Sequence, residues 1–355
     1  MREVMPTLDS WGPEVSTVAL ATVVSTSGST PRPAGARLAV APDGRLVGSV
    51  SGGCLEADVV EEAMRTLTGE APPRTLHYGI ADEMGWSVGL ACGGEVDVFV
   101  EKLDWGGGDP VVAALREAVA QDRAVALCTA LEGPSPGSHI LVREGTIVGD
   151  SSPLGAEVEL LETAGRRLVS GVAGVDQLAV GSVFVQPLVP APKMVIIGAV
   201  DTGSLLAQLA KVLGYHVTVI DPRERFCTRE RFPAADELVV EWPRAALSKI
   251  TLGPRDAAVC LTHDPKFDDP TLTALMAGRA GYIGAVGSRR TQGLRRDRLA
   301  AAGATAEDLE RIHGPVGLDL GASTPAEMAL EILAELVGAR YGRAGAQRRP
   351  AAPAG

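Results

Sequence analysis

Several features that would assign a chain quickly to a functional class are missing from this sequence. It has only five cysteines, and no two of them stand at the CxxC spacing of a zinc site or a redox motif. We therefore expect reduced, free thiols. No apolar run reaches the roughly 20 residues that a membrane helix needs, and the N-terminal segment lacks the apolar core of a secretory signal. These absences predict a cytoplasmic protein without a membrane span.

Positive charge is also scarce. Lys and Arg together number 33 against 44 Asp and Glu, which gives a formal net charge of −11. An acidic chain without a basic stripe argues against nucleic acid as a partner. A small molecule that carries phosphate is still compatible with this charge, because backbone amides bind phosphate without net positive charge. A Walker loop and an HExxH helix are absent as well.

What is present predicts an α/β protein of two domains. The 355 residues and the 46% apolar content suffice for more than one buried core. Residues 1–188 mix helical patterns with short strands and hairpin turns, which predicts an α+β domain. After a proline-rich linker over 189–192, unbroken apolar strands alternate with helices over 193–343, as in a Rossmann-like, doubly wound parallel sheet. We expect the tail 344–355 to be disordered, and we find no internal repeat.

The first strand of the predicted Rossmann-like domain leads into a variant of the dinucleotide-binding fingerprint. Residues 198–203 read Gly-Ala-Val-Asp-Thr-Gly, so Val200 stands where the fingerprint has its middle glycine. The side chain of Val200 would crowd the usual route of a pyrophosphate. About 20 residues further on, an aspartate ends the second strand, where a ribose-binding acid is expected. The candidate cofactor-binding residues here are Gly198, Thr202, Gly203 and Asp221.

Two cysteines lie beside paired glycines. Gly52, Gly53 and Cys54 come between a strand and a helix, where free amides could hold an anion and the helix dipole could stabilise a thiolate in the first turn. The alternative is a small buried cysteine behind a tight turn. A similar run, Cys92-Gly93-Gly94, enters a strand instead, so its thiol gains less from a dipole. Spacing alone leaves open which cysteine is functional.

Further candidates stand at the ends of later strands, where a parallel sheet forms its ligand crevice. His263 could be an acid–base group or a ligand, or simply a solvated loop histidine. The two arginines after Gly287 could form an oxyanion or phosphate fork, or merely begin a charged helix. A glycine-rich loop over 317–321 precedes a capping box formed by Thr324 and Glu327. The candidate binding residues in this group are Gly287, Ser288, Arg289, Arg290 and Asp319.

Four segments together resemble the XdhC/CoxI family. They are residues 48–56 (GSVSGGCLE), 91–94 (ACGG), 282–290 (YIGAVGSRR) and 313–322 (HGPVGLDLGA), the last followed by TPAE at 324–327. The resemblance implies an accessory protein that binds the molybdenum cofactor (molybdopterin) and protects it. It also implies support for sulfuration by a cysteine desulfurase and transfer to the large subunit of a molybdenum hydroxylase of the xanthine or carbon monoxide dehydrogenase type. In that task Cys54 or Cys92 would contact the metal or a sulfur.

Three hypotheses for the function therefore stand at this point. The first is a cofactor chaperone or insertase that acts, by our expectation, as a homodimer. The second is an NAD(P)-dependent oxidoreductase on the same scaffold, with Asp221 on the adenosine ribose and Val200 as the residue that argues against it. A pure interaction scaffold with neither ligand is the third and weakest reading.

Overall fold

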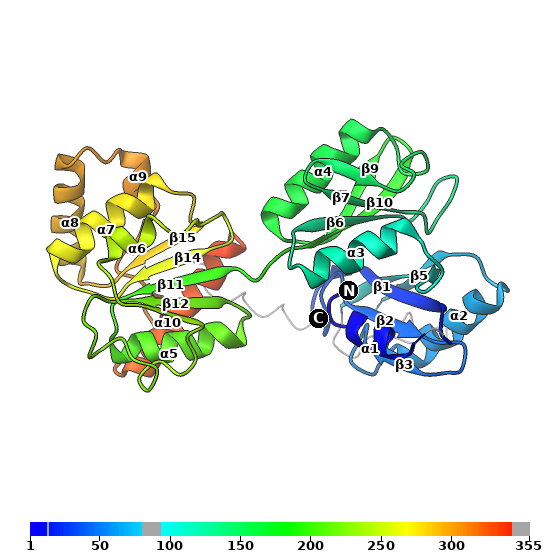
Figure 1. Ribbon diagram of the computed structural model, residues 1–355, viewed down its shortest axis with the longest axis horizontal. Helices are drawn as coiled ribbons and strands as arrows, with labels where there is room; N and C mark the ends of the chain where they lie inside the picture. Colours follow the sequence, from blue (N-terminus) through cyan, green and yellow to red (C-terminus); the bar gives the residue numbers. More distant parts are fainter. Residues whose placement is uncertain (13, 80–93, 343–355) are drawn as a thin grey trace, which may run out of the picture. The chain divides into compact units, whose positions relative to one another are not determined.

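A computed structural model gives the fold of the chain (Figure 1) and describes residues 1–12, 14–79 and 94–342. The predicted disordered tail, 344–355, lies outside these residues. The chain divides into two compact units, unit 1 up to Pro190 and unit 2 from Ala191. Within the described ranges, no helix is both long enough and apolar enough to cross a membrane.

Unit 1 begins with an antiparallel five-stranded sheet in the order β3-β2-β1-β5-β4. Most of β1 is buried on both faces. One face packs against helix α2 and the other faces the rest of the unit, which explains why β1 is a nearly continuous apolar run rather than an alternating one. The elements are β1 (Thr17–Ser27), β2 (Arg37–Val40), β3 (Leu46–Gly48), α2 (Glu56–Thr68), β4 (Arg74–Tyr78) and β5 (Glu95–Asp104).

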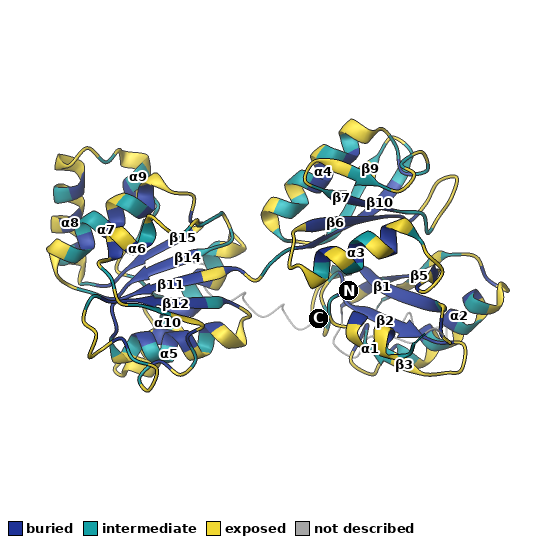
Figure 2. Ribbon diagram, in the orientation of Figure 1, coloured by how far each residue is buried: buried dark blue, intermediate teal, exposed yellow. Residues whose placement is uncertain are grey.

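A second antiparallel sheet follows in the order β8-β7-β6-β10-β9, with helix α4 on one face. Its other face shares a core with the first sheet and with the helices α1 and α3. Figure 2 shows the central strands of both sheets buried and the outer helix faces exposed. The elements are α1 (Met5–Ser10), α3 (Pro110–Ala120), β6 (Val125–Ala130), β7 (His139–Arg143), β8 (Thr146–Val148), α4 (Glu157–Ser170), β9 (Gly174–Leu178) and β10 (Gly181–Leu188).

The two sheets of unit 1 are two copies of one topology. Each copy runs through three strands, a helix and two more strands, and both place their strands in the same spatial order. The sequence carries the same signal, because residues 18–22 read VALAT and residues 125–129 read VALCT. Our prediction that the chain has no internal repeat is therefore wrong. The repeat is hard to see in the sequence because the last two strands of the first copy are joined by residues 79–94, whereas only residues 179–180 join them in the second.

Unit 2 is a parallel sheet in the order β13-β12-β11-β14-β15-β16. This is the strand order of the Rossmann fold. Helices α5 and α10 pack on one face, and α6, α7 and α8 pack on the other (Figure 1). The strands are β11 (Lys193–Ile197), β12 (His216–Ile220), β13 (Glu237–Val239), β14 (Ala257–Cys260), β15 (Tyr282–Ala285) and β16 (Ile312–His313). The helices are α5 (Asp201–Val212), α6 (Pro243–Leu247), α7 (Pro265–Ala277), α8 (Arg289–Ala301), α9 (Ala306–Glu310) and α10 (Pro325–Arg340).

The predicted fold class is confirmed: a mixed α+β unit is followed by a Rossmann-like, doubly wound parallel sheet. The topology brings the carboxyl ends of β11, β12, β14 and β15 to one edge of the sheet in unit 2. The strand order reverses between β11 and β14, and an open α/β sheet forms its ligand crevice at such a point. The candidate site of unit 2 is therefore sought at this edge.

Candidate functional site

The carboxyl edge of the unit 2 sheet holds two adjoining cavities of about 560 Å³ and about 450 Å³. Both are lined by Val200, Leu261 and His263, so these residues stand at the boundary between them. We call the larger cavity the first lobe; it also includes Asp221, Arg223, Thr262, Asp264, Pro265 and Phe267. We call the smaller one the second lobe; it also includes Thr202, Val286, Gly287, Ser288 and Met328. Volumes of this size suit a small molecule.

Asp221 lies in the first lobe, but the carboxylate is already engaged by the chain itself. It is 2% exposed and accepts hydrogen bonds from the backbone amide of Ala199 at 2.7 Å and from the guanidinium of Arg223 at 2.9 and 2.7 Å. Burial opposes ionisation of Asp221, yet these hydrogen bonds prevail and lower the pKa of its carboxyl group. Asp221 thus holds the glycine turn and Arg223 in place, which leaves little of its acceptor capacity for a ribose.

The turn over residues 198–200 is shaped by close packing. Gly198 has φ +106°, and a Cβ there would stand 2.9 Å from the side chain of Thr262. Gly203 is buried, and a Cβ there would crowd the carbonyl of Gly198 at 3.1 Å, so this glycine lets α5 pack close to the turn. Val200 lines both lobes. Its side chain therefore occupies the place where a dinucleotide fingerprint leaves room for pyrophosphate.

Arg223 is the residue of the first lobe that our sequence analysis missed. Its guanidinium lies over the ring of Phe226, with 4.6 Å between Cζ and the ring centroid. His263 lines both lobes and is exposed, with no recorded hydrogen bond to any described residue. A usable signal was present in the sequence, because a residue just after the strand-ending Asp is well placed to meet a phosphate in Rossmann sheets. Our prediction for this position named Asp221 but not Arg223.

The candidate residues that follow β15 fall into two groups, one that lines the second lobe and one that does not. Gly287 and Ser288 line it, and Ser288 also caps α8 by accepting a hydrogen bond from the amide of Thr291 at 3.1 Å. Arg289 and Arg290 are the first two residues of α8, are exposed and are not among the lining residues. The structure therefore favours the charged helix start over the phosphate fork for these two arginines.

The glycine-rich loop over 317–321 is held by acids of α10. Glu335 accepts a hydrogen bond from the amide of Gly317 at 2.8 Å, and Glu331 accepts one from that of Leu320 at 2.9 Å. Asp319 is exposed in this loop and lines neither lobe. The predicted capping box is confirmed, since Thr324 and Glu327 satisfy each other's backbone amides.

In unit 1, the Gly-Gly-Cys turn is organised by one carboxylate. Residues 49–55, which we call the Glu56 loop, wrap around the side chain of Glu56, and Gly52 and Gly53 adopt φ +77° and +120°. Glu56 accepts hydrogen bonds from the amides of Val50, Ser51, Gly52, Gly53 and Leu55 and from the hydroxyls of Ser49 and Ser51. Our expectation that the glycine amides are free for an outside anion is therefore wrong.

The pKa of Glu56 follows from this environment. Partial burial acts to raise it, but the hydrogen bonds from Ser49, Ser51 and the loop amides outweigh burial and hold the pKa of the carboxyl group well below its usual range. The loop thus contains its own anion at neutral pH, and a second one is not expected to displace it.

Cys54 lies at the outside of this loop and is exposed. Helix α2 begins at Glu56 with Leu55 as its N-cap, so Cys54 precedes the helix, and our placement of its thiol in the first helical turn is wrong. The alternative of a buried cysteine is wrong as well. Of the other cysteines within the described ranges, all are buried, and burial raises the pKa of the Cys128 thiol to about 12. Cys54 is thus the accessible thiol among them.

The second cysteine motif is only partly visible. Cys92 and Gly93 lie outside the described residues. Gly94 is buried, and a Cβ there would clash with the carbonyl oxygen of Ser29, so no side chain fits at that position. Across the described residues, no group of three or more His, Cys, Asp or Glu side chains is arranged to hold a metal ion.

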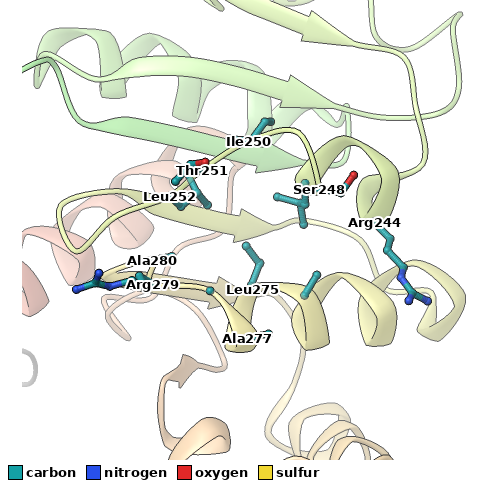
Figure 3. Close-up of a pocket in the computed structure, with 12 residues that line it drawn as sticks. Arg244, Ser248, Ile250, Thr251, Leu252, Leu275, Ala277, Arg279 and Ala280 are labelled. Carbon is teal, nitrogen blue, oxygen red and sulfur yellow. The ribbon is translucent and has the colours of Figure 1, made fainter.

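A third cavity, of about 430 Å³, lies between α6 and α7 (Figure 3). It is lined mainly by apolar groups from the segments 244–252 and 274–280, which precede β14 and β15 in the chain. The cavity therefore lies toward the amino ends of these strands, at the opposite edge from the two lobes. It holds none of the candidate residues, and we attach no chemistry to it.

Two models of known protein families match this chain. The family model described as the XdhC Rossmann domain matches residues 194–336, and the model of the XdhC and CoxI family matches residues 14–79. Together they cover more than half of the chain. This chain belongs to the XdhC/CoxI family.

Two curated proteins are similar to this chain over most of their length. A protein from Bacillus subtilis, named as a probable subunit of xanthine dehydrogenase, is 29% identical over 90% of this chain and 92% of its own. The molybdenum cofactor insertion chaperone PaoD from Escherichia coli is 28% identical over 90% of this chain and 83% of its own. A crystal structure from Bacillus halodurans, described as a xanthine dehydrogenase, is 26% identical, with a TM-score of 0.70 over 99% of this chain and 98% of that one.

Proposed function

We propose that this protein binds the molybdenum cofactor and assists its insertion into a molybdenum hydroxylase of the xanthine or carbon monoxide dehydrogenase type. The similarity to PaoD, a molybdenum cofactor insertion chaperone, over nine-tenths of this chain carries the proposal. An accessory role also agrees with the Bacillus subtilis relative, whose name places it with xanthine dehydrogenase. On this view the chain is a cofactor chaperone rather than a metabolic enzyme.

The crevice fits a phosphate-bearing pterin in size and presents basic side chains to it. The two lobes have volumes typical of small-molecule sites. Arg223 and His263 are the basic groups among their lining residues. A pterin would be oriented by such polar groups and shielded by the apolar walls that Val200, Leu261 and Phe267 supply. The bound cofactor would supply the metal and its sulfur chemistry, while these side chains hold and orient it.

We further propose that Cys54 contributes the thiol that this family role requires. It is exposed, and the Glu56 loop fixes its backbone position. A thiol presented in this way can contact a metal or accept sulfur when a cysteine desulfurase is the donor. Protection of the cofactor, sulfuration with that desulfurase, delivery to the large subunit of the hydroxylase and a homodimeric state are parts of the same proposal.

Co-purification tests the proposal. Protein produced in a host that makes the cofactor should carry stoichiometric molybdopterin, and Cys54→Ala should carry several-fold less because one contact is lost. Ser152→Ala is the matched control, since Ser152 is exposed in the β8–α4 connection, the counterpart of the Glu56 loop in the second copy. Wild-type protein without pterin under these conditions would contradict the cofactor role, and equal loading of Cys54→Ala and wild type would remove Cys54 from it.

The second candidate is an NAD(P)-dependent oxidoreductase on the same sheet. The Rossmann strand order supports it. Val200 and the engagement of Asp221 by Ala199 and Arg223 argue against an ordinary dinucleotide. Fluorescence titrations with NADH and NADPH that both stay flat would eliminate this candidate.

A further inference from the structure

One cation of the first lobe is fixed in place by the chain. The Nε and Nη2 groups of Arg223 donate to the two carboxylate oxygens of Asp221 at 2.9 and 2.7 Å, and its backbone amide donates to the same carboxylate at 2.9 Å. Asp221 is 2% exposed, so the anchor is rigid. Because the anchor is also bound to the amide of Ala199, the position of the guanidinium is tied to the glycine turn of the crevice.

The other edge of this guanidinium is open. Nη1 of Arg223 has no recorded partner among the described residues, and the side chain is 47% exposed while it lines the first lobe. The ring of Phe226 supports one face of the group. An arginine whose first edge is satisfied by a buried carboxylate, and whose second edge faces a cavity, is pre-organised to donate paired hydrogen bonds to an anion.

Two carboxylates, those of Asp221 and Asp264, also line this lobe, so its formal charge is not positive, but both have donors of the chain as partners. Both oxygens of Asp221 are used within the chain. Asp264 caps α7 by accepting a hydrogen bond from the amide of Lys266 at 3.0 Å. His263, the other basic side chain of the lining, is exposed. An anionic ligand in this lobe therefore depends on the open edge of Arg223, with His263 as the other basic side chain of the lining.

We propose that Arg223 binds a phosphomonoester group of the ligand in the first lobe. A phosphomonoester offers three oxygens and close to two negative charges near neutral pH, which suits the open edge of a fixed guanidinium. The group has two sources, the phosphate of the pterin or the 2′-phosphate of a nucleotide. For the pterin, the inference rests on the proposed function. Arg223 thus takes the phosphate-binding role for which the sequence offers the Gly52 and Gly53 amides and the arginines that begin α8 as candidates.

Two pairs of ligands test this inference in the full-length protein. The first pair is the oxidised, fluorescent pterin phosphate derived from molybdopterin and the same pterin after phosphatase treatment; the second is NADPH and NADH. Within one pair, wild type should bind the phosphorylated member about ten-fold more tightly or better, since charge-assisted hydrogen bonds are lost with the phosphate. Arg223→Gln should reduce that ratio to near one. The pair that shows the preference identifies the source of the phosphate.

Arg225→Gln is the matched control. Arg225 follows in the same segment, is exposed, lines neither lobe and has no recorded partner within the described part of the chain, so its loss changes net charge alone and should preserve the ratio. Arg223→Lys keeps the charge without the paired donors and should give an intermediate ratio, which covers the case in which Arg223→Gln does not fold.

The outcomes separate the two proposals. Ratios near one for both pairs in wild type, or an unchanged ratio in Arg223→Gln, would overturn the assignment of Arg223. If wild type binds both pterins with equal affinity, and both nucleotides with equal affinity, the assignment of Arg223 is wrong but the cofactor role still stands. If wild type binds neither pterin but binds NADPH more tightly than NADH, the result supports phosphate binding by Arg223 and contradicts the cofactor role.

Discussion

At the scale of single residues, carboxylates decide which groups of this protein are left for a ligand. Glu56 accepts hydrogen bonds from the amides of its own loop. Asp221 accepts them from the amide of Ala199 and from one edge of the Arg223 guanidinium. Both carboxylates were visible in the sequence, but their partners were not. Motif spacing predicted loops with free amides, whereas the folded chain satisfies those amides internally, as buried polar groups require.

The first prediction concerns Glu56. Glu56→Gln removes the charge that binds the amides and hydroxyls of the Glu56 loop, and it should destabilise unit 1 by about 1–3 kcal/mol at neutral pH. Because the folded pKa of Glu56 is lowered, its stabilisation is complete above the unfolded pKa of about 4.3 and is lost as the pH falls from there toward the folded pKa. Denaturant unfolding of wild type and variant should therefore converge at acid pH.

The second copy supplies the control for that experiment. Glu157 begins α4 as Glu56 begins α2, but its recorded side-chain hydrogen bond is one of 3.4 Å from Ser151. Glu157→Gln should change the free energy of unfolding by no more than about 0.5 kcal/mol. Equal losses in the two variants, or a Glu56 effect that does not depend on pH, would contradict the role given to Glu56.

At the scale of elements, a buried ion pair between α7 and α8 holds the ends of β14 and β15 in position. Arg295 of α8 lies 2.8 Å from Asp268 of α7, with side chains 1% and 2% exposed. Asp268 also accepts a hydrogen bond from the hydroxyl of Thr262, and Arg295 donates to the carbonyl of Val286 at 3.0 Å. Both Thr262 and Val286 line the crevice, so this pair links the ends of β14 and β15.

The second prediction follows from this pair. Asp268→Asn leaves the buried guanidinium of Arg295 without its counter-charge and should lower the free energy of unfolding by about 3–5 kcal/mol. Asp269→Asn is the matched control one residue away, because Asp269 pairs with Arg298 at the surface and should cost at most about 1 kcal/mol. Urea denaturation measures both losses. Similar losses of unfolding free energy in the two variants would show that the buried pair does not stabilise the sheet.

At the scale of the whole molecule, the chain is built from modules with separate cores. The core clusters of unit 2 are drawn from residues after 191 alone, and those of unit 1 from residues before 190. Unit 1 itself contains the repeated topology, and the first copy alone carries the Gly-Gly-Cys turn; the counterpart segment 153–155 reads Pro-Leu-Gly. Candidate chemistry in unit 1 is thus confined to one of two similar scaffolds.

The third prediction tests this modularity. Residues 191–355 produced alone should fold and unfold in a single cooperative transition, since both faces of their sheet are covered by their own helices. Circular dichroism during heating measures the transition. A fragment that shows no cooperative unfolding would mean that the core of unit 2 depends on the rest of the chain.

The sequence by itself determined the fold class, most strands and helices of both units and the family, because apolar periodicity, turn residues and motif spacing are local properties. The predicted alternation of apolar strands and helices over 193–343 and the capping box of Thr324 and Glu327 are both confirmed. Tertiary structure alone decided the capture of loop amides by Glu56 and the anchoring of Arg223, and it made plain a repeat in unit 1 that the sequence shows over only a short stretch. These depend on which distant groups meet in space, and a carboxylate binds the nearest unsatisfied donors whatever the spacing of the motif suggests.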